Sequence, residues 1–241
     1  MIQHMLNKRS IPLPSPSRSR GPKPTRMDPD QLLDAAQAVF AEEGLRAATL
    51  RAIARKAGCD PALIYYHFQD KEAMFEALLD RTIGPVVKEL AALGDPQDPR
   101  TVAEFFWKVI SIYHAHLGGN AGLRGLVRGE IVRGGEGIRE NIAKRVLPVL
   151  EAIGRITHLG IKRGEIREDT SPQLTTFFMI RMELEILDLI PVMAKHLSGM
   201  PGNQAVAMAE RAWFLMFWRG IATRPDEPLP FLPESGRLAH E

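Results

Sequence analysis

At 241 residues the chain is long enough for one large domain or two small ones, and its 45% hydrophobic and 25% charged residues are typical of a globular protein. No stretch approaches the roughly 20 apolar residues of a membrane span, and the N-terminus lacks the apolar segment of a secretory signal, so we expect no membrane contact. The single cysteine, Cys59, excludes an internal disulfide and a multi-cysteine zinc site, which favours a reducing cytoplasm as the location.

The net charge of +2 is unevenly distributed. Residues 1–27 contain six basic residues and no acidic one, a formal +6, which leaves 2 − 6 = −4 for the rest of the chain. This Pro- and Ser-rich segment is predicted to be a disordered basic arm. Such an arm suits a polyanionic partner, but a solvated leader ahead of a start at Met27 explains the composition equally well.

Four helices are predicted for residues 28–93. Asp28, followed by Pro29 and by Gln31 at the capping-box position, predicts the first helix start, and Gly44 its end. A second, short helix follows Thr49 and stops before Gly58. The third runs from Asp60-Pro61 to about His67, and the fourth from near Asp70 to about Leu93.

The remaining periodic segments are also helical, which predicts an all-α fold. Breakers at residues 94–99 mark the expected boundary of a second domain, residues 94–222. Its expected helices span residues 101–117, 121–133, 137–163 (with a kink at Pro148), 171–198 and 201–222. The Pro-rich residues 223–241 are predicted to be a flexible tail.

The second and third helices have helix-turn-helix spacing. Gly58 suits the positive φ of the turn, Ala54 and Ala57 allow close packing, and Asp60 caps the following helix. A generic three-helix unit shares these features. The residues around them are more specific, because Thr49-Leu50-Arg51-Ala52-Ile53-Ala54-Arg55-Lys56-Ala57-Gly58, Tyr65-Tyr66-His67-Phe68 and Asp70-Lys71-Glu72 closely resemble the TetR/AcrR signature over residues 28–80.

The resemblance implies a DNA-binding role for this segment. Thr49, Tyr66, His67 and Lys71 would contact phosphates, Pro61, Ala62 and Tyr65 would face base edges, and Arg51 and Arg55 would contact phosphates or bases. Packing explains Tyr65 as well, a helix C-cap explains His67, and a solvated face explains both arginines. Asp60, with Pro61-Ala62, departs from the family pattern and places an anion near the DNA, so base contacts are expected to be apolar.

The resemblance also implies that the second domain binds a small effector and forms a homodimer. Apolar residues surround nearly the whole of helix 201–222, and its neighbour 171–198 is similarly apolar, which requires burial on several sides. The expected dimer contacts are Leu187, Ile190, Ala209, Trp213 and Phe217. Burial of both helices inside one large monomeric core is the alternative.

An effector pocket is expected among helices 101–163, closed on one side by residues 171–185. Its candidate residues, which ordinary core packing or surface ion pairs explain equally well, are Phe106, Trp107, Ile110, Tyr113, His114, Arg128, Phe178, Met182 and Glu183. His114 and His116 point in different directions on a helix, so no metal site is expected, and no cofactor either.

We therefore predict a regulator that binds double-stranded DNA, acting as a repressor released from a palindromic operator by a small apolar or aromatic effector. An enzyme is the first alternative, but the chain has no Walker loop, GxGxxG, GxSxG or HExxH motif. A helical adaptor is the second, and it leaves the motif from Thr49 to Lys71 unexplained. Activation in place of repression stays open.

Overall fold

The computed structural model describes residues 27–93, 100–197 and 199–233, and in this part of the chain the fold is all-helical. The helices are α1 (Pro29–Glu43), α2 (Leu50–Ala57), α3 (Pro61–His67), α4 (Lys71–Ala91), α5 (Val102–Leu117), α6 (Ala121–Arg133), α7 (Glu136–Lys162), α8 (Pro172–Leu197) and α9 (Gly202–Ile221). None of the helices described here is long and apolar enough to cross a bilayer.

Local capping sets the helix starts as the sequence predicts. Asp28 and Gln31 form a complete capping box at α1, and Thr49 and Asp60 accept backbone N–H groups at the starts of α2 and α3. Asp70 does the same for α4. Because each cap satisfies an N–H that has no partner inside the helix, these starts depend on a few neighbouring residues.

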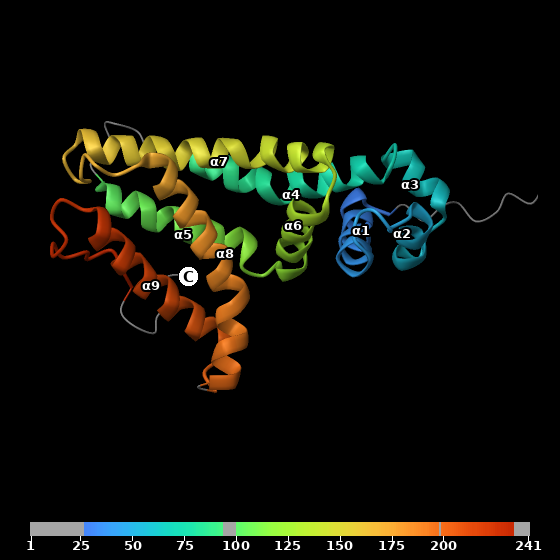
Figure 1. Ribbon diagram of the computed structural model, residues 1–241. Coiled ribbons are helices and arrows are strands. Elements are labelled where there is room, and N and C mark those ends of the chain that lie inside the picture. Colours follow the sequence, from blue (N-terminus) through green and yellow to red (C-terminus); the bar gives the residue numbers. More distant parts are fainter. Residues whose placement is uncertain (1–26, 94–99, 198, 234–241) are drawn as a thin grey trace, which may run out of the picture.

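The helices form an elongated molecule with α1, α2 and α3 at one end (Figure 1). Helix α4 leads from this end into the larger group of helices and packs along α7, while α6 lies against α1. At the other end α8 and α9 pack against each other. Helix α7 continues through Pro148, where a kink was predicted.

The hydrophobic cores do not follow the predicted boundary at residue 94. The core of the first three helices also contains Leu123 and Leu126 of α6 and Ile142 of α7. Conversely, Val86 and Leu90 of α4 belong to the core of the second domain. The end built from α1–α3 is therefore completed by residues from the second domain.

Two predicted terminal segments fall partly inside the described residues. Residues 1–26 of the predicted basic arm lie outside them, and Met27 packs against the first core. The predicted flexible tail is corrected for residues 223–233, because Leu229, Phe231 and Leu232 pack against the second core. Apolar side chains within the Pro-rich stretch explain this packing; residues 234–241 lie outside the described residues.

Candidate nucleic-acid interface and effector pocket

Helices α2 and α3 are joined by a tight turn of helix-turn-helix type. Gly58 adopts a left-handed conformation with φ of 69°, where a side chain is disfavoured, and the Cys59 N–H donates to the carbonyl of Ala54 at 3.0 Å. Ile53 and Ile64 are fully buried between the helices. This packing leaves the other face of α3 open to solvent.

The predicted DNA-contacting residues lie mainly on this open face. Tyr65 is 62% and Tyr66 81% exposed, although large aromatic side chains are usually buried. Ala62, Arg51 and Arg55 are also exposed. Pro61 and His67 are half-buried, and the His67 ring makes an edge contact with the Tyr66 ring at 4.9 Å. The face exposes aromatic rings and guanidinium groups together, which suits contact with phosphates and base edges.

The ammonium group of Lys71 also has a structural role that the sequence did not indicate. Its Nζ donates to the carbonyl of Arg46 at 2.9 Å and to that of Ala48 at 3.2 Å, so it joins the start of α4 to the turn before α2. The exposed Arg46 is a basic residue that the sequence reasoning missed. Its position three residues before the N-cap Thr49 is the feature of the sequence that could have identified it as a DNA-contacting candidate.

A large apolar cavity lies in the second domain, between α4, α5, α6, α7 and α8. Its volume is about 430 Å³, within the range of small-molecule sites. The walls are mostly aliphatic: the lining residues are Ile83, Val86, Tyr113, Leu117, Leu123, Arg124, Val127, Arg128, Ile131, Val132, Ile142, Val146, Val149, Ile180, Arg181, Leu184 and Asp188. Such a lining favours an elongated hydrocarbon over a polar ligand.

Of the nine predicted effector residues, Tyr113 and Arg128 line this cavity. Phe106 and Trp107 instead contact the aromatic rings of α9, and Phe178 and Met182 are on the outer surface. Ile110 and Glu183 border a much smaller cavity that also touches Tyr113. The sequence did not indicate the α4 residues or the aliphatic walls of this cavity, because aliphatic residues at helical spacing do not distinguish a cavity from a packed core.

Three arginines and two carboxylates form a charged edge of the cavity. Asp188 accepts from Arg124 and from Arg128, each at 2.6 Å, and Glu185 accepts from Arg181 at 2.7 Å. Arg124 is buried, whereas the side chains of Arg128 and Arg181 are nearly half exposed. The edge has a formal charge of +3 − 2 = +1, so it attracts an anionic group.

Helix α6 connects the cavity to the DNA-binding end. One face carries Leu123, Val127 and Ile131 into the cavity wall. From the same helix, the Glu130 carboxylate accepts the buried N–H of Leu45 at 3.1 Å. At the helix start, Asn120 Oδ1 accepts from Gln37 of α1 at 2.7 Å. A displacement of α6 by a ligand would therefore act on the middle of α1 and on the turn just after it.

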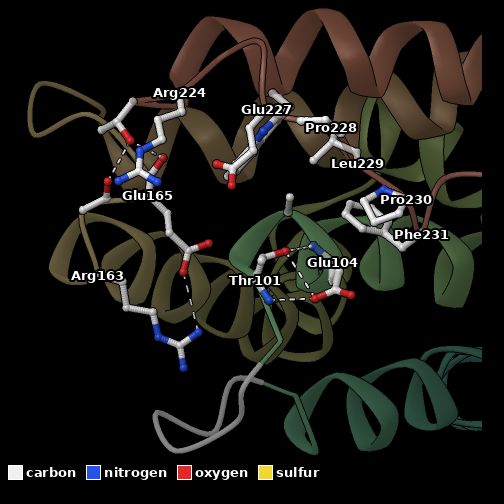
Figure 2. A pocket seen from close by; sticks show the side chains of 14 residues that line it. Thr101, Glu104, Arg163, Glu165, Arg224, Glu227, Pro228, Leu229, Pro230 and Phe231 are labelled. Carbon is white, nitrogen blue, oxygen red and sulfur yellow. Dashed lines mark hydrogen bonds and ion pairs between the residues drawn. The ribbon is translucent and has the colours of Figure 1, made fainter.

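A second cavity, of about 200 Å³, lies where the start of α5 meets the loop after α7 and residues 223–231. Figure 2 shows Thr101 and Glu104 engaged in the cap of α5, and Arg163 facing Glu165. Pro228, Leu229, Pro230 and Phe231 form its other side. This cavity has no contact with α6, so it lacks the connection that the larger cavity has.

Among the described residues, one cluster brings three metal-ligating side chains together: His114 of α5, Glu183 of α8 and Glu210 of α9. His114 Nδ1 and Glu210 Oε1 are 2.6 Å apart, and this hydrogen bond raises the pKa of His114 although burial opposes the shift. Burial, and then the charge of Glu210, raise the pKa of Glu183 well above its ordinary value. Burial raises the pKa of the neighbouring Tyr113 phenol as well.

The residues predicted for a dimer interface hold α8 and α9 together within the chain. Leu187 is 5% exposed, and Ile190, Ala209 and Trp213 pack around it. The Phe217 ring stacks on Trp213, with centroids 5.3 Å apart, and contacts Phe106. These side chains pack between α8 and α9 while four of the five stay partly exposed, and their part in a dimer interface stays a prediction.

Other apolar side chains of the same two helices face solvent. On α8 these are Leu174, Phe177, Phe178, Met182, Leu189, Val192 and Met193, and on α9 they are Met208 and Met216. On α8 most recur at intervals of three or four residues, and together with the two methionines of α9 they form the exposed stripe of α8 and α9. An exposed apolar surface of this extent is typical of a protein interface.

The sequence pattern of the family described as "Bacterial regulatory proteins, tetR family" matches residues 32–78. The fatty acid metabolism regulator protein of Bacillus subtilis (strain 168) is 28% identical over 144 residues, 60% of this chain and 73% of that protein. The repressor KstR2 of Rhodococcus jostii (strain RHA1) is 49% identical, but over 49 residues, 20% of this chain and 24% of that protein. The strongest local identity is thus confined to a short segment.

The fold has similar neighbours among solved structures. The transcriptional regulator FadR from Bacillus subtilis, in a crystal structure with stearoyl-CoA, superimposes with a TM-score of 0.65 at 24% identity, over 80% of this chain and all of that one. The ketosteroid regulator KstR2 of Mycobacterium tuberculosis gives a TM-score of 0.61 at 20% identity, over 83% and 97% of the two chains. The similarity of fold therefore extends through both domains.

Proposed function

Because the chain is a DNA-binding transcriptional regulator of the TetR family, we propose that it is a cytoplasmic repressor whose effector is a long-chain acyl compound with an anionic head, such as an acyl-CoA. The aliphatic cavity of about 430 Å³ carries this proposal. Its walls suit a hydrocarbon chain, since burial of each CH₂ contributes about 0.8 kcal/mol. The stearoyl-CoA bound by the Bacillus subtilis regulator supports the same chemical class.

The charged edge supports the anionic head. Arg128 and Arg181 are accessible to solvent at the cavity, and each already holds a carboxylate. A phosphate or carboxylate of the effector would add to, or exchange with, those contacts through charge-assisted hydrogen bonds. A neutral aromatic effector, which the sequence also allowed, would gain no electrostatic attraction from the net positive charge of this edge.

The route from effector to DNA passes through α6. A ligand in the cavity presses on Leu123 and Val127, and the same helix holds Leu45 through Glu130. In a homodimer assembled through the exposed stripe of α8 and α9, a small change at each α1 alters the separation of the two α3 helices. A palindromic operator requires one such separation, so a ligand that prefers another releases the protein from DNA.

Binding assays with the full chain test this proposal. At 50 mM salt, we expect preferential binding to DNA upstream of its own gene over random DNA, with an affinity that falls steeply as salt rises. Stearoyl-CoA should raise the melting temperature and weaken specific DNA binding at least tenfold, whereas coenzyme A without an acyl chain should do neither. If stearoyl-CoA and stearate both leave the melting temperature and the DNA affinity unchanged, the acyl-effector proposal is refuted.

A further inference from the structure

We propose that His114, Glu183 and Glu210 form a binding site for a divalent transition-metal ion that joins α5, α8 and α9. The three residues come from helices that pack against one another at the end of the molecule away from α1–α3 (Figure 1). One ligand atom from each lies within 4.8 Å of the others. None of the three residues lines the acyl cavity, although Tyr113 and Ile180 border both that cavity and the small one beside Glu183, and the proposal does not depend on the identity of the effector.

Glu183 provides the observation that points to a cation. The residue is 1% exposed, no N–H or hydroxyl group of the described residues donates to either carboxylate oxygen, and the one hydrogen-bonding group beside them is the carboxylate of Glu210. A buried carboxyl without a donor destabilises the folded state even when it is neutral, and more so when it is charged. The oxygens lie beside a second buried carboxylate, Glu210, which increases the need for positive charge.

The neighbouring cation does not meet this need. Arg124 is buried close by, but its guanidinium donates to Asp188, to the carbonyls of Leu117 and Gly118, and to the carbonyl of Leu187. His114 is held by Glu210. None of these bonds is to Glu183, so the Arg124 charge acts on that carboxyl only through space.

The composition of the cluster indicates the class of ion. One imidazole and two carboxylates form a nitrogen–oxygen set of the kind that binds Zn²⁺, Fe²⁺ or Ni²⁺, and not the all-oxygen set typical of Ca²⁺ or Mg²⁺. Two carboxylates balance the charge of a divalent ion when His114 is neutral. Tetrahedral Zn²⁺ with bonds of about 2.0–2.2 Å separates its ligand atoms by about 3.4 Å. The ligand atoms here lie within 4.8 Å of one another, and His114 Nδ1 and Glu210 Oε1 are 2.6 Å apart, so metal binding requires side-chain rotations that separate this pair.

The site also has room for a fourth ligand and a path for entry. A cavity of about 10 Å³, enough for one water molecule, borders Glu183 together with Val109, Ile110, Tyr113, Met179 and Ile180. The side chain of His114 is 20% exposed, so an ion can reach the cluster from solvent. The positions of His114 and His116 on one helix predicted no metal site, whereas the partners of His114 come from two distant helices.

Metal binding is tested on the untagged full chain after treatment with a chelator. Titration with Zn²⁺ in a calorimeter should show one saturable site per chain. At a free Zn²⁺ concentration 100 times the dissociation constant, the unfolding equilibrium constant should fall about 100-fold, seen as a higher melting temperature. Absence of a saturable site up to 100 µM Zn²⁺ would overturn the proposal.

Three variants locate the site. Glu183→Gln retains the shape of a neutral carboxyl, so it should fold, yet it should weaken Zn²⁺ binding at least tenfold; His114→Gln should do the same. His116→Gln is the matched control, because His116 is on the same helix and contacts a single carboxylate, Glu89, at 2.7 Å. It should bind Zn²⁺ as the parent chain does. Unchanged Zn²⁺ affinity in Glu183→Gln would show that the carboxyl is only a buried neutral acid.

Discussion

The carboxylate of Glu130, on α6, accepts the buried backbone N–H of Leu45, in the turn between α1 and α2, at 3.1 Å. Together with the bond between Gln37 and Asn120, this bond joins a helix of the effector cavity to the DNA-binding end. A Glu130→Ala change leaves the Leu45 N–H without a partner, which costs about 1–3 kcal/mol of folding free energy. We expect it also to reduce the effect of the effector on DNA affinity.

The control for this change is Glu130→Gln, whose amide oxygen can still accept from Leu45. Urea denaturation gives the stability of each variant, and DNA titrations with and without stearoyl-CoA give the ratio of affinities. If Glu130→Ala keeps the parent ratio, the effect of the effector does not pass through this bond.

Filling the acyl cavity should separate effector binding from DNA binding. Val146 lines the cavity, and its neighbour Leu147 is 51% exposed outside it. Val146→Trp places an indole in the space for the hydrocarbon, so stearoyl-CoA should bind at least tenfold more weakly, a loss of about 1.4 kcal/mol. Leu147→Trp adds the same side chain to the surface and should leave affinity unchanged. Equal effector affinity in the two variants, measured by calorimetry, would place the effector elsewhere.

Removing the negative charge at the start of α3 should strengthen DNA binding. Asp60 accepts the N–H of Ala62 at 2.8 Å, and asparagine caps a helix about as well as aspartate. Asp60→Asn therefore retains the helix while removing repulsion from nearby phosphates. We expect about threefold tighter binding at 50 mM salt, with a smaller gain at high salt because the interaction is screened.

The matched control for Asp60→Asn is Glu168→Gln. Glu168 is an exposed acid in the turn between α7 and α8, at the other end of the molecule from α3. Glu168→Gln changes the net charge of the chain by the same amount as Asp60→Asn, so a general effect of net charge on DNA affinity would appear in both variants. A threefold gain in both would mean that Asp60 does not lie near the phosphates.

The exposed stripe of α8 and α9 should be required for dimerisation. Met216 is 73% exposed on α9. In a two-fold interface through this face, the Met216 side chains of both protomers would be buried. Met216→Glu then buries unpaired charge, which costs about 3–5 kcal/mol, and sedimentation should show monomers at micromolar concentration. Leu147→Glu, outside the stripe, should stay dimeric. A Met216→Glu dimer as tight as the parent would exclude this face.

The helix-turn-helix was predictable because its determinants are local. Each helix start depends on a cap that accepts an N–H within three residues of its own position: Asp28, Thr49, Asp60 and Asp70. The turn depends on Gly58, which adopts the positive φ itself. Local signals of this kind do not determine which face of a helix becomes buried. In α9, apolar residues occupy nearly every side, so the pattern could not decide whether Trp213 or Met216 faces solvent.

The remaining differences follow from contacts between distant segments. Glu183 and Glu210 are paired with His114 by the packing of three helices, which no spacing in the sequence reveals. The same holds for Phe231, whose ring contacts Phe214 from within a Pro-rich stretch that composition alone marks as irregular. Periodicity predicts helices, but it does not predict which of them meet.

The shared core of α1–α3 with Leu123, Leu126 and Ile142 limits how this protein can be recombined with its relatives. A hybrid regulator made by exchanging everything after α4 would bring foreign residues against Leu32 and Phe40, at the base of the helix-turn-helix. Hybrids that retain α6 and the first turns of α7 from the parent should tolerate exchange of the remaining helices. The functional unit that reads DNA is therefore discontinuous in the gene, with its second piece beginning at Ala121, after α4 and α5.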